Sequence, residues 1–311
     1  MSDRRFEYVE QRRAQGLPEA EPYVMEGLRD IVDEGVLGAS NHVALALPLV
    51  ARLAAEPRAT AGNEALELAQ FIAGTRGLGA PIVANALRWQ TDGAAQAEDA
   101  AALLHARAEH WGVTAAERRR ALLAKGVAAL DGYRRPLIFD YSSTVADLVR
   151  AMADRGGLDR IVIPESRSID GGRRYMTALA DLGVPILFVP DAAIDYAASR
   201  SSVLLLGAES VTRDGGISNT VGSIVAARAA LSCGLPVYGA ADLFKVGERD
   251  AAELPAPELR RYDFLLKEGE VASTEAPEIE IVPPALVTAI LTEIGPVAPE
   301  AIADARVHRA P

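Results

Sequence analysis

The stretch LLLGAESVTRDGGISNTVG, residues 204–222, runs from an apolar segment into a loop that contains several glycines. Comparable apolar segments occur at LIFD (137–140), RIVIPE (160–165), PILFVPD (185–191) and PVYGAAD (236–242). Segments of helical length separate them. Continuous apolar strands that alternate with amphipathic helices are typical of a parallel sheet covered on both faces. The sequence therefore predicts an α/β fold with a Rossmann-like parallel sheet, covered by helices and joined by right-handed crossovers.

The first part of the chain has a different pattern. In NEALELAQFIAG (63–74) and AQAEDAAALLHARAEHWGV (95–113), apolar residues recur at helical spacing. We therefore predict a helical domain over residues 1–130 and the Rossmann-like domain over residues 131–311. The segment GTRGLGAPIV (74–83) is expected to interrupt the helices, with Pro81 in the first turn of the next one. The last segment, residues 278–305, is expected to add one strand, a proline break and one or two helices.

The composition of the chain disfavours several classes of partner. The chain of 311 residues has a formal net charge of −11, which disfavours a nucleic-acid partner. A single cysteine, Cys233, excludes an intramolecular disulfide, and the four histidines form no cluster that suggests a metal site. The N-terminus lacks the apolar core of a signal peptide, and no segment is long and apolar enough to span a membrane. These features favour a cytoplasmic protein without a membrane or metal partner.

Ligands of open parallel sheets bind outside the carboxyl ends of the strands. The predicted strands end in polar residues, so this edge of the sheet is where we expect the site. The strand ends carry Asp140, Tyr141, Ser142 and Ser143; Glu165, Ser166 and Arg167; Asp191; Glu209; and Asp242 with Lys245 shortly after it.

Two segments near these ends could bind a phosphate group. In YSSTVADLV, Ser142 and Ser143 lie at a helix start, where free backbone N–H groups and the helix dipole favour an anion. The alternative is that a serine here is only an N-cap. In SRSIDGGRRY, Arg167 and Arg173 flank a glycine turn, and their guanidinium groups suit phosphate or carboxylate. The alternative for these arginines is a surface position without a ligand.

A third segment lies in the helical half. TRGLGAPI combines Arg76 with Gly77 and Gly79, which would let the backbone approach an anion closely, or would simply form a turn between helices. The glycine motifs of dinucleotide-binding and triphosphate-binding loops do not occur. Nicotinamide and ATP chemistry are therefore disfavoured, and no cofactor is expected.

Five ordered motifs resemble one superfamily: ESRSIDGG, LADLGVPILFVPDAA, GAESVTRDGGISNTVGS, PVYGAADLFKV and VPPALVTAILTEIG. It contains the alpha, beta and delta subunits of eukaryotic translation initiation factor 2B and the methylthioribose-1-phosphate and ribose-1,5-bisphosphate isomerases. TRGLGAPI is similar to the phosphate loop of that superfamily. The resemblance implies a helical N-terminal domain, a Rossmann-like C-terminal domain, a pocket for a phosphorylated sugar or a nucleoside-derived small molecule, and a homodimer.

The resemblance also assigns roles to residues. The cysteine and the aspartate that it implies for an isomerase fall at Tyr141 and Glu209, so both catalytic side chains are replaced. Glu209 could serve as a base, because a carboxylate at the end of a buried strand is expected to have a raised pKa. Tyr141 is a poorer substitute for a thiol, since the reference pKa of tyrosine is near ~10. Asn219 would hold sugar hydroxyls, and Lys245 matches a lysine of the superfamily.

Two functions stay open at this point. One is an isomerase that converts an aldose 1-phosphate, such as ribose 1,5-bisphosphate or methylthioribose 1-phosphate, into a ketose phosphate with a diverged active site. The other is a non-catalytic regulatory or sensor protein that resembles the initiation factor 2B alpha subunit. In the second case Glu209 would accept a ligand hydroxyl or hold the turn that follows it.

Overall fold

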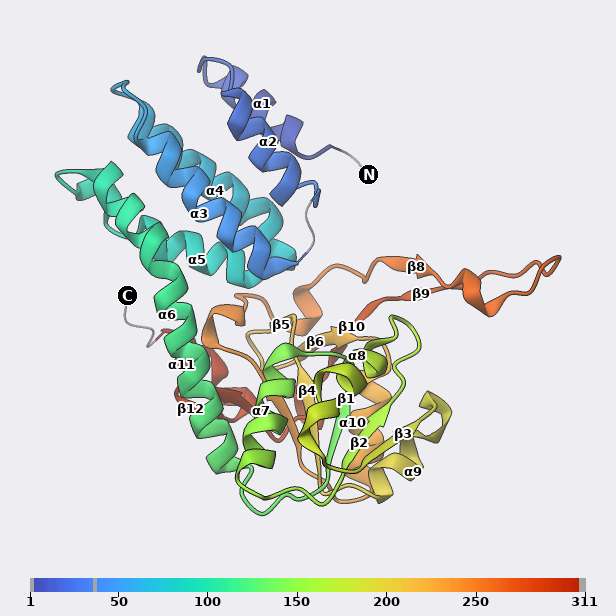
Figure 1. Cartoon of the computed structure of the whole chain (residues 1–311). Coiled ribbons are helices and arrows are strands. Elements are labelled where there is room, and N and C mark those ends of the chain that lie inside the picture. The colour runs from blue at the N-terminus through green and yellow to red at the C-terminus, as the bar shows by residue number, and fades with distance from the viewer. Residues whose placement is uncertain (1–2, 36–37, 308–311) are drawn as a thin grey trace. The chain divides into compact units, whose positions relative to one another are not determined.

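The computed structural model describes residues 3–35 and 38–307, and their contacts divide the chain into two compact units (Figure 1). The division lies between Ala116 and Glu117, inside helix α6 (Ala100–Ala129). The domain boundary expected at residue 130 lies just beyond the end of this helix and stays a prediction. Each unit is described by itself below.

The first unit is helical, as expected from its apolar spacing. Its TRGLG segment does not interrupt the helices: α4 continues through it, and α5 begins after one residue, with Pro81 in its first turn as predicted. Gly77 is required by packing, because a Cβ atom there would lie 2.5 Å from the Cβ of Ala84 on α5. The helices are α1 (Arg5–Ala14), α2 (Pro22–Ile31), α3 (Ala39–Ala54), α4 (Ala61–Gly79), α5 (Pro81–Thr91) and the first part of α6.

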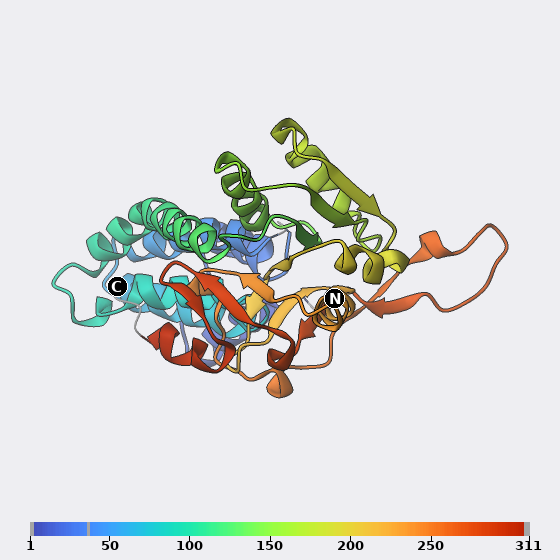
Figure 2. The ribbon, with the colours of Figure 1, turned by 90° about the horizontal axis from the view of Figure 1, so that it is seen from below.

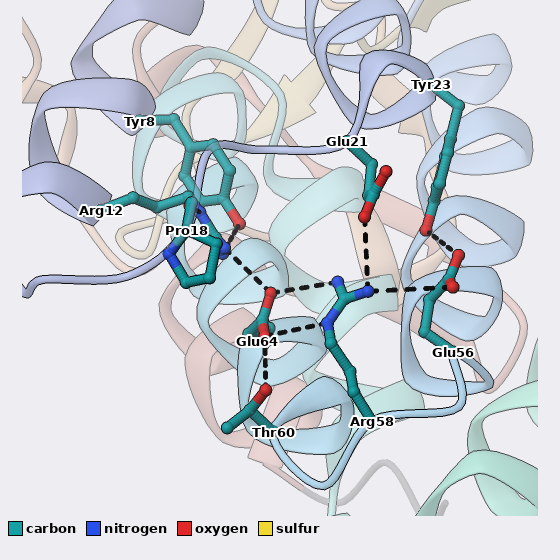
Figure 3. A network of polar contacts seen from close by, with 9 residues as sticks. All are labelled: Tyr8, Arg12, Pro18, Glu21, Tyr23, Glu56, Arg58, Thr60 and Glu64. Carbon is teal, nitrogen blue, oxygen red and sulfur yellow. Dashed lines mark hydrogen bonds and ion pairs between the residues drawn. The ribbon is translucent and has the colours of Figure 1, made fainter.

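A buried network of polar side chains joins α1 to α4 (Figure 3). Arg12 of α1 and Glu64 of α4 form an ion pair of 2.9 Å, and their side chains are only 5% and 3% exposed. Arg58 donates to both oxygens of Glu64, and the Thr60 hydroxyl donates to one of them at 2.7 Å. Arg12 also donates to the Pro18 carbonyl. Glu64 is therefore a fully bonded buried anion that holds two cationic side chains.

Acid should weaken this network. The hydrogen bonds from Arg58, together with those from Thr60 and Arg12, lower the pKa of Glu64 from 4.5 to about 2. Because the pKa is lower in the folded state, ionised Glu64 stabilises the fold above about pH 4.5, and this contribution, about 3 kcal/mol, is lost as the pH falls towards 2. Denaturant unfolding at several pH values, compared between the native chain and Glu64→Gln, should show the stability difference shrinking in acid. A difference independent of pH would contradict this account.

The second unit contains a seven-stranded sheet with the order β12-β11-β7-β4-β1-β2-β3. All pairs are parallel except β11 with β12. The chain proceeds outward from β1 to β3 and then returns to the other side of β1 with β4. The strands are β1 (Pro136–Phe139), β2 (Ile161–Pro164), β3 (Ile186–Val189), β4 (Val203–Gly207), β7 (Val237–Ala240), β11 (Ala289–Thr292) and β12 (Gly295–Val297).

Helices cover both faces of this sheet, as predicted (Figures 1 and 2). Leu204 and Leu206 of β4 pack in one apolar core with α9 and α10, while the alternate residues Val203 and Leu205 pack in a second core with α7 and α8. Burying one such side chain contributes roughly 1.5–3 kcal/mol. The helices are α7 (Ser143–Asp154), α8 (Gly171–Ala178), α9 (Ile194–Ser199) and α10 (Ser223–Ser232).

Two segments differ from the prediction. The loop after β4 is a short hairpin, with β5 (Ser210–Val211) and β6 (Ile217–Thr220) in a second sheet whose third strand is β10 (Ile279–Val282). The tail was expected to be helical after its prolines, but residues 289–297 form β11 and β12, and the helix α11 (Ile302–Val307) comes only afterwards. A short apolar run suits a strand as well as a helix, so the neighbouring strand decides which one forms. Here Ile290 and Leu291 pair with β7 and are fully buried, which favours the strand.

Candidate functional site at the carboxyl ends of β1 and β4

The reversal of strand order at β1 creates a topological switch point between β1 and β4. In open α/β sheets, ligands bind outside the carboxyl ends of the strands at this point. The residues that follow β1 are Asp140 and Tyr141, and the residue pair that follows β4 is Ala208 and Glu209. The topology therefore brings together the two positions that sequence analysis proposed as catalytic.

Asp140 is the buried carboxylate of this site, with 5% of its surface exposed. The Thr220 hydroxyl donates to one of its oxygens at 2.6 Å, and the Ser166 hydroxyl donates to the other at 3.4 Å. Burial raises the pKa of Asp140, and the nearby charge of Glu209 raises it further, while these hydroxyls and the Tyr141 backbone lower it without reversing the shift. Asp140 was recognised as a strand-end residue in the sequence, but not as a member of the site.

Glu209 has the opposite environment. Its side chain is exposed, and within the part of the chain that the structure describes it makes no hydrogen bond or ion pair. The burial expected at the end of β4 is found at Asp140 instead. The Lys245 ammonium donates to the Ala208 carbonyl at 2.6 Å and thereby fixes the turn that carries Glu209. The switch point thus holds one buried carboxyl group and one carboxylate that is available to a ligand.

Tyr141 follows Asp140 in the chain and is half-buried. Its ring lies 5.2 Å from that of Tyr175 on α8, and the Arg174 guanidinium carbon lies 4.3 Å from its ring centroid. The Tyr175 hydroxyl accepts a hydrogen bond from the Ser142 N–H, which ties the residue after Tyr141 to α8. The ring is therefore held between an aromatic and a cationic neighbour.

The start of α7 shows the N-cap that was one of the two roles foreseen for its serines. Ser142 is the N-cap, with its hydroxyl accepting from the Val145 N–H at 3.4 Å. Ser143 and Thr144 follow in the first turn, where backbone N–H groups point out of the helix. Arg119 of α6 donates to the Thr144 hydroxyl and forms an ion pair of 2.6 Å with Asp147. Arg119 was not predicted from the sequence, because it precedes the first strand and does not lie at a strand end.

The loop after β2 is held by Asp191, which follows β3. Its two carboxylate oxygens accept from the N–H groups of Ser166 and Arg167 at 2.9 and 2.8 Å. The Arg167 guanidinium lies over the Phe264 ring at 5.3 Å and has no carboxylate partner in the described residues. Arg173 is exposed and paired with Asp170 at 3.3 Å. Of these two arginines, Arg173 is therefore paired with a carboxylate and Arg167 is not, within the described residues.

Asn219 lies on β6 and is buried, with its amide donating to the Ser223 hydroxyl at 3.0 Å. The nearby start of α10 already has an anion, because Glu280 of β10 accepts from the N–H groups of Gly222 and Ile224. This helix start is therefore occupied by the protein itself, whereas the start of α7 is not filled by a carboxylate in the described residues.

The residues of the predicted phosphate loop belong to the first unit. Arg76 donates to the Nδ1 atom of His42 at 2.9 Å and forms an ion pair of 3.0 Å with Glu34. A Cβ atom at Gly79 would lie 3.3 Å from a nitrogen of the Arg76 guanidinium. The packing of α4 on α5 accounts for Gly77, so these residues have structural partners within their own unit.

Gly171 is required beneath Asp140. A Cβ atom at this position would clash with the Asp140 carboxylate and approach the Tyr141 nitrogen to 2.9 Å. We expect Gly171→Ala to lower the free energy of unfolding by about 1–3 kcal/mol, because the site cannot expand without losing the bonds of Asp140. Gly74→Ala is the control: no atom lies within 4 Å, so the helix should be unchanged or slightly more stable. Equal unfolding midpoints for both variants would refute the proposed packing.

Other candidate features lie outside this edge of the sheet. A hollow of about 430 Å³ is lined by Asp214, Pro284, Ala285, Val287, Thr288, Ala298, Pro299 and Glu300, none of which belongs to the site.

Within residues 3–35 and 38–307, no group of three or more histidine, cysteine, aspartate or glutamate side chains could hold a metal ion. None of the helices described has the length and apolar character needed to cross a membrane.

Comparisons with known proteins agree with this architecture. The chain is 28% identical over 169 residues to translation initiation factor eIF2B subunit alpha of Caenorhabditis elegans, covering 54% of this chain and 55% of that protein. It is 29% identical over 171 residues to methylthioribose-1-phosphate isomerase of Synechocystis, covering 52% and 49%. The chain thus spans about half the length of these relatives. Its relatives include both initiation-factor subunits and sugar-phosphate isomerases.

Solved structures show the same fold. The translation initiation factor eIF-2B of Pyrococcus horikoshii OT3 superposes with a TM-score of 0.73 at 23% identity, covering 90% of this chain and 98% of that one. Residues 59–299 match the Initiation factor 2 subunit family, so the match includes the switch point and all seven strands of the sheet. The chain is a member of the Initiation factor 2 subunit family.

Proposed function

We propose that this protein is an isomerase that converts an aldose 1-phosphate into a ketose phosphate, with Asp140 and Glu209 as the proton-transferring groups. The observation that carries the proposal is the pair of carboxyl groups at the switch point, one buried with a raised pKa and one exposed and unbonded within the described residues. Paired acids in contrasting environments are the usual basis for separate acid and base roles.

The chemistry requires such a pair. When a furanose 1-phosphate becomes a ketose phosphate, the bond between C1 and the ring oxygen breaks and the hydrogen at C2 moves to C1. The ring oxygen gains a proton, and the hydroxyl at C2 loses one, so the atoms balance without a cofactor. Asp140, kept protonated more readily by burial, is suited to donate a proton, and Glu209 is suited to accept one. Tyr141, whose ring contacts Tyr175 and the Arg174 guanidinium, would orient the sugar between Asp140 and Glu209.

A phosphate group has a suitable position at the start of α7. Ser143 and the backbone N–H groups of the first turn would bind its oxygens, with Arg119 and Arg167 supplying positive charge. Asn219 and Lys245 would act in this proposal mainly by holding β6 and the β4 turn in place, since their polar groups are bonded to Ser223 and Ala208. Arg76, Gly77 and Gly79 of the first unit are proposed as a further phosphate loop.

Phosphorus and proton NMR tests the activity directly. The purified chain is incubated with ribose 1,5-bisphosphate, methylthioribose 1-phosphate and other pentose 1-phosphates, and ketose signals are followed with time. Ketose signals with the native chain support the isomerase, provided that the Glu209→Gln variant gives no such signals. Absence of conversion for every sugar, with line broadening that reports binding, would replace this proposal by the second candidate.

The second candidate is a non-catalytic sensor of the same class of ligand, regulatory like the subunit alpha relative. One observation favours it: the position that the resemblance assigns to a catalytic cysteine is Tyr141, whose ring is packed between Tyr175 and Arg174. In that case Glu209 would accept a hydrogen bond from a sugar hydroxyl. For both candidates we propose a homodimer that works in the cytoplasm.

A further inference from the structure

Glu293 is a carboxyl group at the edge of the sheet that carries the candidate site, and the proposed mechanism does not use it. It directly follows β11, in the segment VPPALVTAILTEIG, whose residues 289–292 form a strand instead of the expected helix. Because β11, β7 and β4 are neighbouring parallel strands, Glu293 lies at the same carboxyl edge as Glu209, two strands away. Its side chain is half-buried, whereas that of Glu209 is exposed.

The Glu293 carboxylate holds the start of the turn that follows β7. We name residues 242–247, which contain this turn, the brace. Both oxygens of Glu293 accept from the Leu243 N–H, at 3.2 and 3.0 Å. The Asp242 carboxylate accepts from the next N–H, that of Phe244, at 3.0 Å. Leu243 and Phe244 are buried, so the brace is fixed at its start by two carboxylates and by apolar packing.

The other end of the brace runs along the turn that carries Glu209. The Lys245 ammonium donates to the Ala208 carbonyl at 2.6 Å, on one side of Glu209. The Gly247 N–H donates to the Val211 carbonyl at 2.7 Å, on the other side. The brace therefore holds the backbone both before and after Glu209, and Glu293 holds the brace.

The surroundings of Glu293 do not favour its charge. Burial raises the pKa of Glu293, and the nearby charge of Asp242 raises it further, while backbone N–H groups and the Arg118 guanidinium lower it without reversing the shift. Because the pKa is higher in the folded chain than the 4.5 of an unperturbed glutamate, ionised Glu293 lowers the free energy of unfolding above about pH 4.5. Stability therefore does not account for this carboxyl group. Groups with a shifted pKa gather at functional sites.

We infer that Glu293 is a positioning residue for Glu209 and acts on it through the brace. The inference rests on the proposed function, because it concerns the carboxylate proposed there as the proton acceptor. A base must stay within hydrogen-bond reach of the proton that it removes, and a misplacement of about 1 Å can lower a rate about 100-fold. In the described residues the Glu209 side chain has no bond of its own, so its backbone turn determines where it lies.

The bond to the Leu243 N–H is the step on which this role depends. Among the described residues, Glu293 is the only acceptor for that N–H. Without the carboxylate, a buried donor would be left unpaired, which is costly enough to shift a short turn towards water or another acceptor. The attachments of the brace at Ala208 and Val211 would loosen with it.

Amide hydrogen exchange of the full chain, followed by mass spectrometry, tests the inference without a substrate. Glu293→Met keeps the length of the side chain and removes the acceptor, so peptides covering residues 205–213 and 242–248 should exchange at least about tenfold faster. Glu293→Gln keeps one acceptor oxygen and should stay within about threefold of the native chain. Residues 161–164 of β2, on the other side of β1, are the internal control and should be unchanged.

Turnover and stability give the measurements that separate positioning from a merely structural role. With a sugar that the native chain converts, Glu293→Met should lower kcat about tenfold or more and leave KM within about threefold, and Glu293→Gln should restore most of kcat. The unfolding midpoint of Glu293→Met at neutral pH should not fall, because the variant loses a buried charge together with one hydrogen bond.

Asp99→Ala is the matched control. The Asp99 carboxylate also accepts from a backbone N–H, that of Ala102 at 2.9 Å, but it belongs to the first unit. Its substitution should change neither the exchange of residues 205–213 nor kcat.

Unchanged exchange at residues 205–213 in Glu293→Met would overturn the inference, as would equally fast exchange in Glu293→Gln or a matching increase in β2. Faster exchange there with an unchanged kcat would also overturn it, because the position of Glu209 would then not depend on the brace. A native chain that converts no sugar contradicts the proposed function instead, and the exchange measurement still decides whether Glu293 holds the turn of Glu209.

Discussion

Glu64→Gln is expected to lower the free energy of unfolding by about 3–5 kcal/mol at neutral pH, the cost of removing one partner from a buried ion pair. Glu64 is the common acceptor for Arg12, Arg58 and Thr60. Arg58 is partly exposed and has Glu21 and Glu56 within reach, so it can find another partner. Arg12 is buried, so its charge would be left without an anion. Chemical denaturation followed by circular dichroism measures the loss.

Two controls separate the buried charge from the helix itself. Glu26→Gln removes a carboxylate from an exposed pair with Arg29 at 3.8 Å, and should change stability by less than about 0.5 kcal/mol. The double change Arg12→Met with Glu64→Leu removes both charges and should restore much of the loss, because apolar side chains of similar volume tolerate burial. A double variant no more stable than Glu64→Gln would mean that the network stabilises α4 by hydrogen bonding rather than by charge compensation.

Glu209→Gln is expected to reduce turnover about 100-fold or more while ligand affinity stays within a few-fold. The amide has the shape of the carboxylate and can still meet a sugar hydroxyl, but it cannot accept a proton from the substrate. The effect should appear in kcat rather than in KM. Steady-state kinetics by NMR and a separate binding titration measure the two parts.

Glu165→Gln is the control for this prediction. Glu165 also follows a parallel strand, but that strand is β2, on the other side of β1 from β4. Its substitution should leave turnover within a few-fold of the native value. Full activity in Glu209→Gln would remove Glu209 from the mechanism, and equal losses in both variants would indicate a general electrostatic effect of the sheet edge instead.

The sequence predicted the architecture well where one local pattern had one solution. Apolar runs such as VLLLG and RIVIP became β4 and β2 because both faces of the sheet are covered. The tail residues 289–292 were predicted to be helical and form a strand instead, since a short apolar run suits either structure and pairing with β7 decides for the strand. The glycines of TRGLG also had two interpretations, and the close approach of α5 to Gly77 shows that this residue has a packing role.

The candidate site was predictable in position but not in detail. The strand-end rule found Asp140, Tyr141 and Glu209, yet it could not say which carboxyl group is buried, because this depends on how far the loops after β1 and β4 extend. The bond from Thr220 to Asp140 joins residues 80 positions apart. Arg119 approaches the start of α7 from a helix that precedes the sheet. Such contacts follow from tertiary packing, which no local pattern contains.

The most direct test of the proposed function is the time course of ribose 1,5-bisphosphate, methylthioribose 1-phosphate and related pentose 1-phosphates with the purified chain, followed by phosphorus and proton NMR. We expect at least one sugar to yield ketose phosphate signals with the native chain, and we expect Glu209→Gln to bind the same sugar without converting it. If the native chain binds these sugars but forms no ketose over many hours, the proposed isomerase activity is contradicted and the non-catalytic sensor remains as the proposed function.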